Sequence, residues 1–123
     1  MRFLLDANAL ILLLAGHERL VSRASLCGEG DLCLSAISFA EVAHGSASGK
    51  PPEIEVLDRV RRRIPVLPFD VDAADRYARM PFRRHRFDRL IAAHAQALDL
   101  TLVTANPRDF GDIPDLRVED WTR

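Results

Sequence analysis

Short apolar runs alternate with longer segments of helical spacing, and this alternation constrains the fold more than any other feature. Five runs have the character of buried strands, at residues 2–6, 32–36, 64–70, 100–104 and 116–121. Helical spacing occupies residues 38–45, 53–63, 70–80 and 87–100. Parallel strands need crossover connections of about a dozen residues or more, which helices supply. We therefore predict an α/β fold, a three-layer sandwich with a central, mostly parallel sheet of about four or five strands flanked by helices.

The segment 87–100 carries the clearest helical period. Its apolar residues recur at intervals of three and four, at Phe87, Leu90, Ile91, Ala95 and Leu98. This spacing predicts a helix with those residues on one inward face.

The size and charge of the chain limit the remaining choices. With 123 residues, 48% of them hydrophobic, it can bury one core, so we predict a single domain over residues 1–123. Seventeen basic against eighteen acidic residues give a net charge of −1, so nucleic-acid binding would have to be local. Cys27 and Cys33 form no C-x-x-C motif, which is typical of inert thiols in a reducing compartment.

The apolar N-terminal stretch superficially resembles a secretory signal. Asp6 and Asn8 interrupt it, and the uninterrupted run that follows is too short to cross a bilayer. We expect a cytoplasmic protein with no membrane partner.

Four acidic residues stand at strand ends or helix starts. Asp6 ends the first strand, Glu41 follows the second, Asp88 opens the helix 87–100 and Asp109 follows the strand 100–104. Ligands of open α/β sheets bind beyond the carboxyl ends of the strands, where these residues would converge. Crowded carboxylates repel one another unless a cation joins them. Because all the ligands are oxygens, the pattern predicts Mg²⁺ or Mn²⁺.

Each acidic residue also has a structural explanation. Ser38 and Glu41 match the S-x-x-E pattern of a capping box. Asp88 could cap its helix or favour the helix dipole, and Asp109 could be a turn residue. Asp6 is harder to explain in this way, because a buried carboxylate is costly without a partner.

Three blocks of sequence resemble the conserved blocks of PIN-domain proteins, in particular the VapC-type toxins of type II toxin–antitoxin pairs. They are "LLDANALI", "SAISFAEVAHG" and "FDRLIAAHAQALDLTLVTANPRDF", the last followed by "LRVEDW". The resemblance implies a PIN-like fold and a Mg²⁺-dependent endoribonuclease, with Mn²⁺ as a substitute. It also implies a cognate antitoxin and a homodimer.

The resemblance assigns roles by position. Asp6, Glu41 and Asp88 match three acidic residues of the family. Relatives differ over the fourth acid, which falls on Asn106 or Asp109, and we choose Asp109 because asparagine supplies no charge. Asp6, Asp88 and Asp109 would hold the metal, and Glu41 would order the metal or the water that attacks the RNA phosphate.

Polar and basic residues surround these positions. Asn8, Thr104 and Asn106 would support the site. In "FRRHRFDR", Arg84, Arg86 and Arg89 are candidates for contacts with RNA phosphate, although a solvated charged face is equally compatible with the pattern. The four histidines have no metal-ligand spacing and should be structural or exposed, with His85 set apart by its neighbours.

Other functions fit less well. A receiver domain would carry paired acids after its first strand, and haloacid-dehalogenase-like phosphatases would carry D-x-D where this chain has Asp6 and Asn8. A PIN-like binding module with weak or lost nuclease activity stays open because position 106 is asparagine. The sequence contains no motif that identifies an RNA target.

Overall fold

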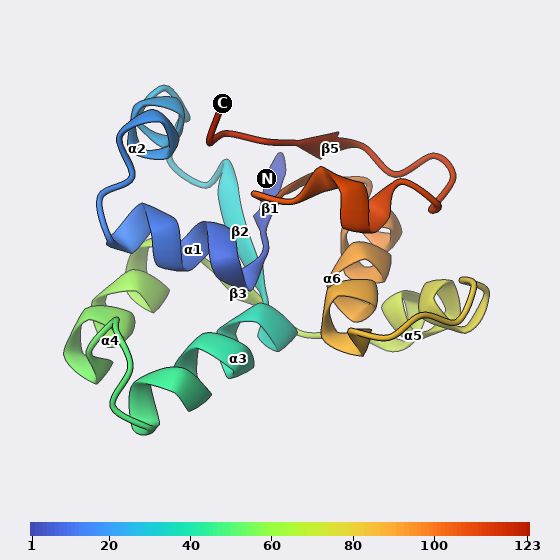
Figure 1. Cartoon of the computed structure of the whole chain (residues 1–123), viewed down its shortest axis with the longest axis horizontal. Helices are drawn as coiled ribbons and strands as arrows, with labels where there is room; N and C mark the ends of the chain where they lie inside the picture. Colours follow the sequence, from blue (N-terminus) through green and yellow to red (C-terminus); the bar gives the residue numbers. More distant parts are fainter.

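Five short strands form a single sheet in the computed structural model, which describes residues 1–123. The strands are β1 (Phe3–Leu5), β2 (Leu32–Ser35), β3 (Val66–Leu67), β4 (Thr101–Val103) and β5 (Val118–Glu119). They lie in the order β3-β2-β1-β4-β5, and every neighbouring pair is parallel (Figure 1). The predicted α/β sandwich with a parallel sheet is confirmed.

Six α-helices and one 3₁₀ helix connect these strands. They are α1 (Ala7–Leu14), α2 (Glu18–Ser25), α3 (Ala36–Ala47), α4 (Ile54–Arg63), α5 (Val71–Ala78), α6 (Arg86–Ala97) and η1 (Pro107–Phe110). All four predicted helices are present, whereas α1 and α2 had not been predicted. None of the helices is long and apolar enough to span a membrane.

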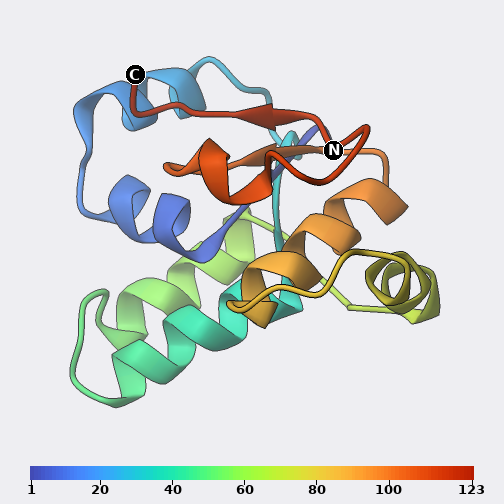
Figure 2. The ribbon, with the colours of Figure 1, turned by 45° about the vertical axis from the view of Figure 1, so that its right-hand side comes forward.

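The sheet separates two hydrophobic cores. Phe3 and Leu5 of β1 face a core that α1, α2, α3 and α4 complete, with Trp121 closing it near the C-terminus. Leu4 points the opposite way, into a core built mainly by α6 and the segment after β4. Figure 2 shows α5 and α6 together on one side of the molecule. Burial on both faces explains why the strands are continuous apolar runs.

The inward face of α6 differs from the predicted one. Ile91 and Ala95 are buried as expected, but Phe87 is 58% exposed and Leu98 is 39% exposed. Both lie at ends of the helix, Phe87 in its first turn and Leu98 at its C-cap. The period therefore predicted the middle of the helix correctly and its ends wrongly.

His94 links the middle of α6 to the start of α3. Its Nδ1 atom lies 2.8 Å from Oγ of Ser35, the residue that caps α3 by accepting a hydrogen bond from the backbone N–H of Ile37. The ring also meets the Phe69 ring edge-on, with centroids 5.4 Å apart. Burial lowers the pKa of His94 and so favours the neutral ring.

Asp6 ends β1 and caps α1. Its Oδ1 accepts a hydrogen bond of 2.8 Å from the backbone N–H of Ala9, and its own backbone N–H donates to the carbonyl oxygen of Val103. The carboxylate therefore has a structural role in addition to its predicted one. Asp followed by an apolar helical run is a sequence signal for this cap.

We expect protonation of His94 to destabilise the fold. Because the pKa of His94 is lowered in the folded protein, the unfolded chain takes up a proton first as the pH falls below about 6.5. Stability is then fully present above that pH and is lost below it, with a slope of at most about 1.4 kcal/mol per pH unit. Urea unfolding of wild type and His94→Gln between pH 7 and pH 5 checks this: the wild type should lose stability more steeply. Parallel curves would contradict the argument.

Two substitutions distinguish the helix-capping role of the Asp6 side chain from the effect of its negative charge. Asp6→Asn and Asp6→Ala both remove the charge, but only alanine removes the acceptor for Ala9. We expect Asp6→Ala to be less stable than Asp6→Asn by about 1 kcal/mol, measured by denaturant unfolding in EDTA. Equal stability of the two variants would show that the cap contributes nothing.

Candidate acidic active site

The four predicted acidic residues converge at the carboxyl edge of the sheet. Asp6 follows β1, Glu41 lies on α3 and Asp88 in the first turn of α6, and Asp109 lies on η1 after β4. Their charges are close enough for one carboxylate to raise the pKa of another, as Asp88 and Asp109 do for Asp6. The fold thus brings together residues that are far apart in the sequence.

Asp6 is the most buried of the four. Burial is the largest cause of its raised pKa, and the charges of Asp88 and Asp109 add to it. Hydrogen bonds with the side chain of Thr104 and the backbone of Ala9 oppose the shift. Asp6 is therefore held in place by neutral donors while its negative charge has no cationic partner.

Glu41 carries an unsatisfied oxygen. Its Oε1 atom is buried and has no hydrogen-bond partner, and its pKa is raised by burial and then by Asp88 and Asp6. The alternative capping box is absent, because Ser35 is the N-cap of α3 and the Ser38 hydroxyl donates to the carbonyl oxygen of Leu5 at 3.2 Å. Glu41 thus has no structural partner that would explain its position.

Asp88 is not a helix cap either. His85 occupies the N-cap position of α6 in a left-handed conformation with φ of 63°, and no side chain caps the helix. The pKa of Asp88 is raised by burial and then by Asp109, while His85 and Arg89 oppose the shift. As an acid in the first turn, Asp88 still interacts favourably with the helix dipole.

Asn106 and Asp109 are hydrogen-bonded partners. Nδ2 of Asn106 donates to Oδ2 of Asp109 at 2.9 Å, and the backbone N–H of Asn106 donates to Oγ1 of Thr104 at 3.1 Å. Since the Thr104 side chain also lowers the pKa of Asp6, neutral groups lie between these two carboxylates. Asn106 therefore orients Asp109, which supplies the charge at this corner.

Arg89 is engaged inside the protein. Only 3% of it is exposed, and its Nη2 donates to both carboxylate oxygens of Asp112, at 2.7 and 2.9 Å. This pair ties α6, next to Asp88, to the segment that follows η1. This burial and pairing do not support the predicted contact of Arg89 with RNA phosphate, and the long-range pairing with Asp112 left no local signal in the sequence.

An open cleft of about 540 Å³ lies in front of Glu41 and Asp88. It is lined by Asn8, Glu41, His85, Arg86, Phe87 and Asp88. A narrower recess shares His85 and Asp88 with it and is lined also by Arg83, Arg84, Arg89 and Asp109. Arg84 and Arg86 are exposed beside these hollows, and their contact with RNA phosphate stays a prediction. Phe87 was not predicted at this site.

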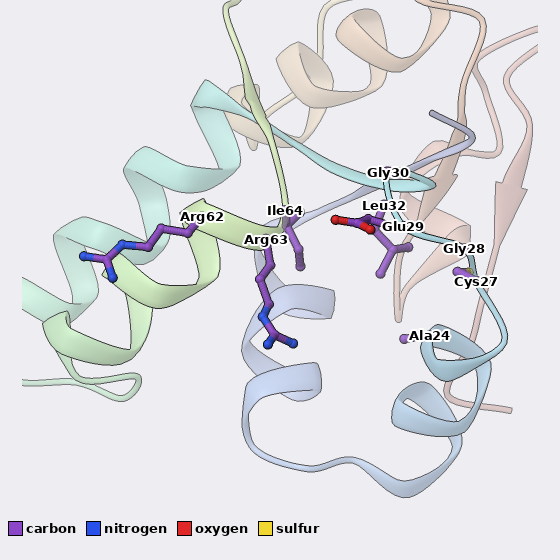
Figure 3. A pocket seen from close by; sticks show the side chains of 9 residues that line it. All are labelled: Ala24, Cys27, Gly28, Glu29, Gly30, Leu32, Arg62, Arg63 and Ile64. Carbon is purple, nitrogen blue, oxygen red and sulfur yellow. The ribbon is translucent and has the colours of Figure 1, made fainter.

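A second hollow, of about 490 Å³, lies elsewhere on the molecule. Arg62, Arg63 and Ile64 border it from the end of α4, and the loop with Glu29 borders it from the other side (Figure 3). Glu29 is its only carboxylate. This hollow therefore lacks the set of oxygen donors found at the edge of the sheet with Asp6, Glu41, Asp88 and Asp109, which we call the acidic edge.

The residues of the acidic edge fit a divalent cation. No group of three His, Cys, Asp or Glu side chains is drawn together as a ready cage, in keeping with the repulsion between like charges. However, Oε1 of Glu41 is buried without a partner, and the pKa values of Asp6, Glu41 and Asp88 are raised in part by neighbouring carboxylates. A hard cation with oxygen ligands, such as Mg²⁺ or Mn²⁺, would offset both costs.

Comparison with known proteins gives a consistent assignment. The PIN domain family model matches residues 3–116. The tRNA(fMet)-specific endonuclease VapC of Shigella flexneri is 30% identical over 99% of both chains, and the protein of that name from Salmonella typhimurium is 28% identical over 98% of both. Ribonuclease VapC2 of Haemophilus influenzae is 26% identical over 98% of both.

Solved structures agree with these relatives. A chain of DNA-bound VapBC from Salmonella typhimurium superimposes with a TM-score of 0.86 at 30% identity, covering 98% of both chains. A chain of VapBC2 from Rickettsia felis, bound to a promoter DNA fragment, gives 0.84 at 26% identity and covers 98% of this chain and 99% of that one. The chain therefore belongs to the PIN-domain family and is a VapC-type member of it.

Proposed function

We propose that this chain is the endoribonuclease toxin of a toxin–antitoxin pair, a single PIN domain that hydrolyses RNA phosphodiester bonds with Mg²⁺ or Mn²⁺. The observation that carries the proposal is the set of electrostatically coupled carboxylates at the sheet edge, with Oε1 of Glu41 left unsatisfied. The relatives are named as ribonucleases and endonucleases, which supports the same chemistry.

The four acidic residues would have different roles in the reaction. Asp6, Asp88 and Asp109 would hold the cation, which when bound lowers the pKa of water and offsets the charge of the phosphate. Glu41 lines the cleft, and its carboxylate would order the cation or the attacking water and can take up a proton from that water.

Neighbouring residues position these acids and the substrate. Thr104 and Asn106 orient Asp6 and Asp109, and Asn8 borders the cleft beside Glu41. Arg84 and Arg86 can contact RNA phosphates at the opening and thereby offset the repulsion between RNA and the carboxylates. The alternative of an inactive binding module was kept open because position 106 is an asparagine without charge. Asn106 donates a hydrogen bond to Asp109, which supplies the fourth carboxylate, so the asparagine does not favour that alternative.

We also propose a cognate antitoxin, a homodimer and a cytoplasmic location, where RNA is available. Two of the similar structures are VapBC complexes, which supports the antitoxin. The homodimer is proposed from the resemblance to VapC-type toxins.

Removal of single acidic groups should stop cleavage. We expect Asp6→Asn and Asp88→Asn to abolish hydrolysis of a mixed pool of structured RNAs in Mg²⁺, and Glu41→Gln to slow it by roughly 10²- to 10⁴-fold. Asp75→Asn, an exposed acid on α5, is the matched control and should cleave normally. Intact RNA with wild type in Mg²⁺ and Mn²⁺, or cleavage that survives EDTA or Asp88→Asn, would contradict the proposal.

The same charges should cost stability when no cation is present. The pKa values of Asp6, Glu41 and Asp88 are raised in the fold, so their stabilising effect is present at acidic pH and is lost as the pH rises through those values. Glu41→Gln should therefore be more stable than wild type in EDTA at pH 7, and the difference should vanish near pH 4. In wild type, Mg²⁺ at 100 times its Kd should add about 2.7 kcal/mol.

Thermal unfolding with and without Mg²⁺ measures both effects. Asp75→Asn again serves as the control, because it removes a charge outside the site. A wild type that gains no stability from Mg²⁺ or Mn²⁺ would show that the acidic edge does not bind a divalent cation.

A further inference from the structure

An apolar groove lies beside the cleft that Glu41 and Asp88 line, which we call the acidic cleft. It has a volume of about 500 Å³ and is lined by Ile37, Ala40, Glu41, His44 and Phe87. The four residues on α3 follow the spacing i, i+3, i+4 and i+7, which places them on one face of that helix. Phe87 belongs to the first turn of α6, and Figure 2 shows that turn beside α3.

Phe87 is exposed although it is large and apolar. More than half of its surface, 58%, faces solvent, so the core does not account for it. It directly precedes Asp88 in the sequence, and it lines the acidic cleft as well as the groove. Glu41 is also shared by the two hollows. The groove is therefore a continuation of the site in which the phosphate would be cut.

The chemistry of the groove fits a nucleobase. An unpaired base has a flat π-face that stacks on aromatic rings and a polar edge that forms hydrogen bonds. Phe87 offers the ring, while Glu41 and His44 offer polar groups at the border. The cationic Arg86 lines the adjoining cleft and Arg84 the recess next to it, so the phosphates on either side of such a base would meet positive charge.

We propose that this groove holds an unpaired nucleobase next to the scissile phosphate, stacked on Phe87. The inference rests on the proposed ribonuclease function and adds to it a further residue that contacts the substrate. Phe87 is then a substrate-binding residue that holds an unpaired base, whereas the carboxylates perform the chemistry.

A fluorescent base tests the stacking directly. The probe is a set of short single-stranded oligoribonucleotides of randomised sequence with one internal 2-aminopurine, titrated in Mg²⁺ in the Asp6→Asn background so that the RNA stays intact. We expect quenching of 2-aminopurine on binding. Phe87→Leu should weaken binding about tenfold and remove the quenching, and Phe87→Trp should restore both. Leu26→Ala, which removes an exposed apolar side chain elsewhere, is the control and should behave as the parent protein.

An abasic probe distinguishes stacking from a change in shape. When the 2-aminopurine is replaced by an abasic nucleotide, Phe87 and Phe87→Leu proteins should bind with equal affinity. An unchanged affinity of Phe87→Leu for the base-containing probe would overturn the stacking proposal. So would a variant that keeps its RNA affinity and instead loses self-association in sedimentation, because the groove would then be a protein interface.

The ribonuclease function and the base-binding groove are overturned by different results. Cleavage of the RNA pool by wild type, combined with no effect of Phe87→Leu on binding or cleavage, overturns the base-binding groove and leaves the ribonuclease intact. Wild type that cleaves no RNA overturns the ribonuclease. Binding of 2-aminopurine RNA with Phe87-dependent quenching would in that case still support the groove, because the titration needs no turnover.

Discussion

Repulsion among carboxylates at one edge of the sheet is the constraint on which the rest of the site depends. The parallel strands bring Asp6 and Asp109 to the same end of the molecule, and α3 and α6 add Glu41 and Asp88. Burial raises the pKa of Asp6, Glu41 and Asp88, and the neighbouring negative charges raise those pKa values further. A fold that keeps such a group together must hold each member by other means.

The surrounding contacts provide that support. Asp6 accepts a backbone hydrogen bond as the cap of α1, and Asn106 donates to Asp109. The pair of Arg89 and Asp112 ties α6 to the segment after η1, so Asp88 and Asp109 stand on elements that are fixed to each other. The bond to Arg89 is also the main reason why the pKa of Asp112 is lowered, so Asp112 remains a charged partner of arginine. These contacts stabilise the scaffold without neutralising the acids of the site.

The fold was largely predictable because buried parallel strands are apolar on both faces and are separated by helices. The five strands were found for this reason, and the four helices with a clear period were found as well. The sequence "ANALILLL" of α1 is apolar on nearly all sides, so it has no period that separates a helix from a strand. The short helix α2 was also missed, although it is strongly amphipathic, because its apolar positions are few.

The acidic residues could be predicted from their positions, but their surroundings could not. Asp6 was identified because it ends a buried strand, yet the sequence did not reveal how Thr104 would meet it. The capping box at Ser38 was a wrong alternative because the N-cap of α3 is Ser35, three residues earlier. The burial of Arg89 and Phe87 is the reverse of what their residue types suggest. Arg89 is buried against Asp112, and Phe87 is exposed beside the cleft. Local pattern carries no information about such distant partners.

We propose that the four acids form one site that takes up a divalent cation. The most direct measurement is a pH titration of the side-chain carboxyl groups by ¹³C NMR, with and without Mg²⁺. We expect Asp6, Glu41 and Asp88 to titrate above their ordinary pKa values without the cation and to shift downward together when Mg²⁺ is added. Ordinary, independent titration of the three groups, unchanged by Mg²⁺, would contradict the account.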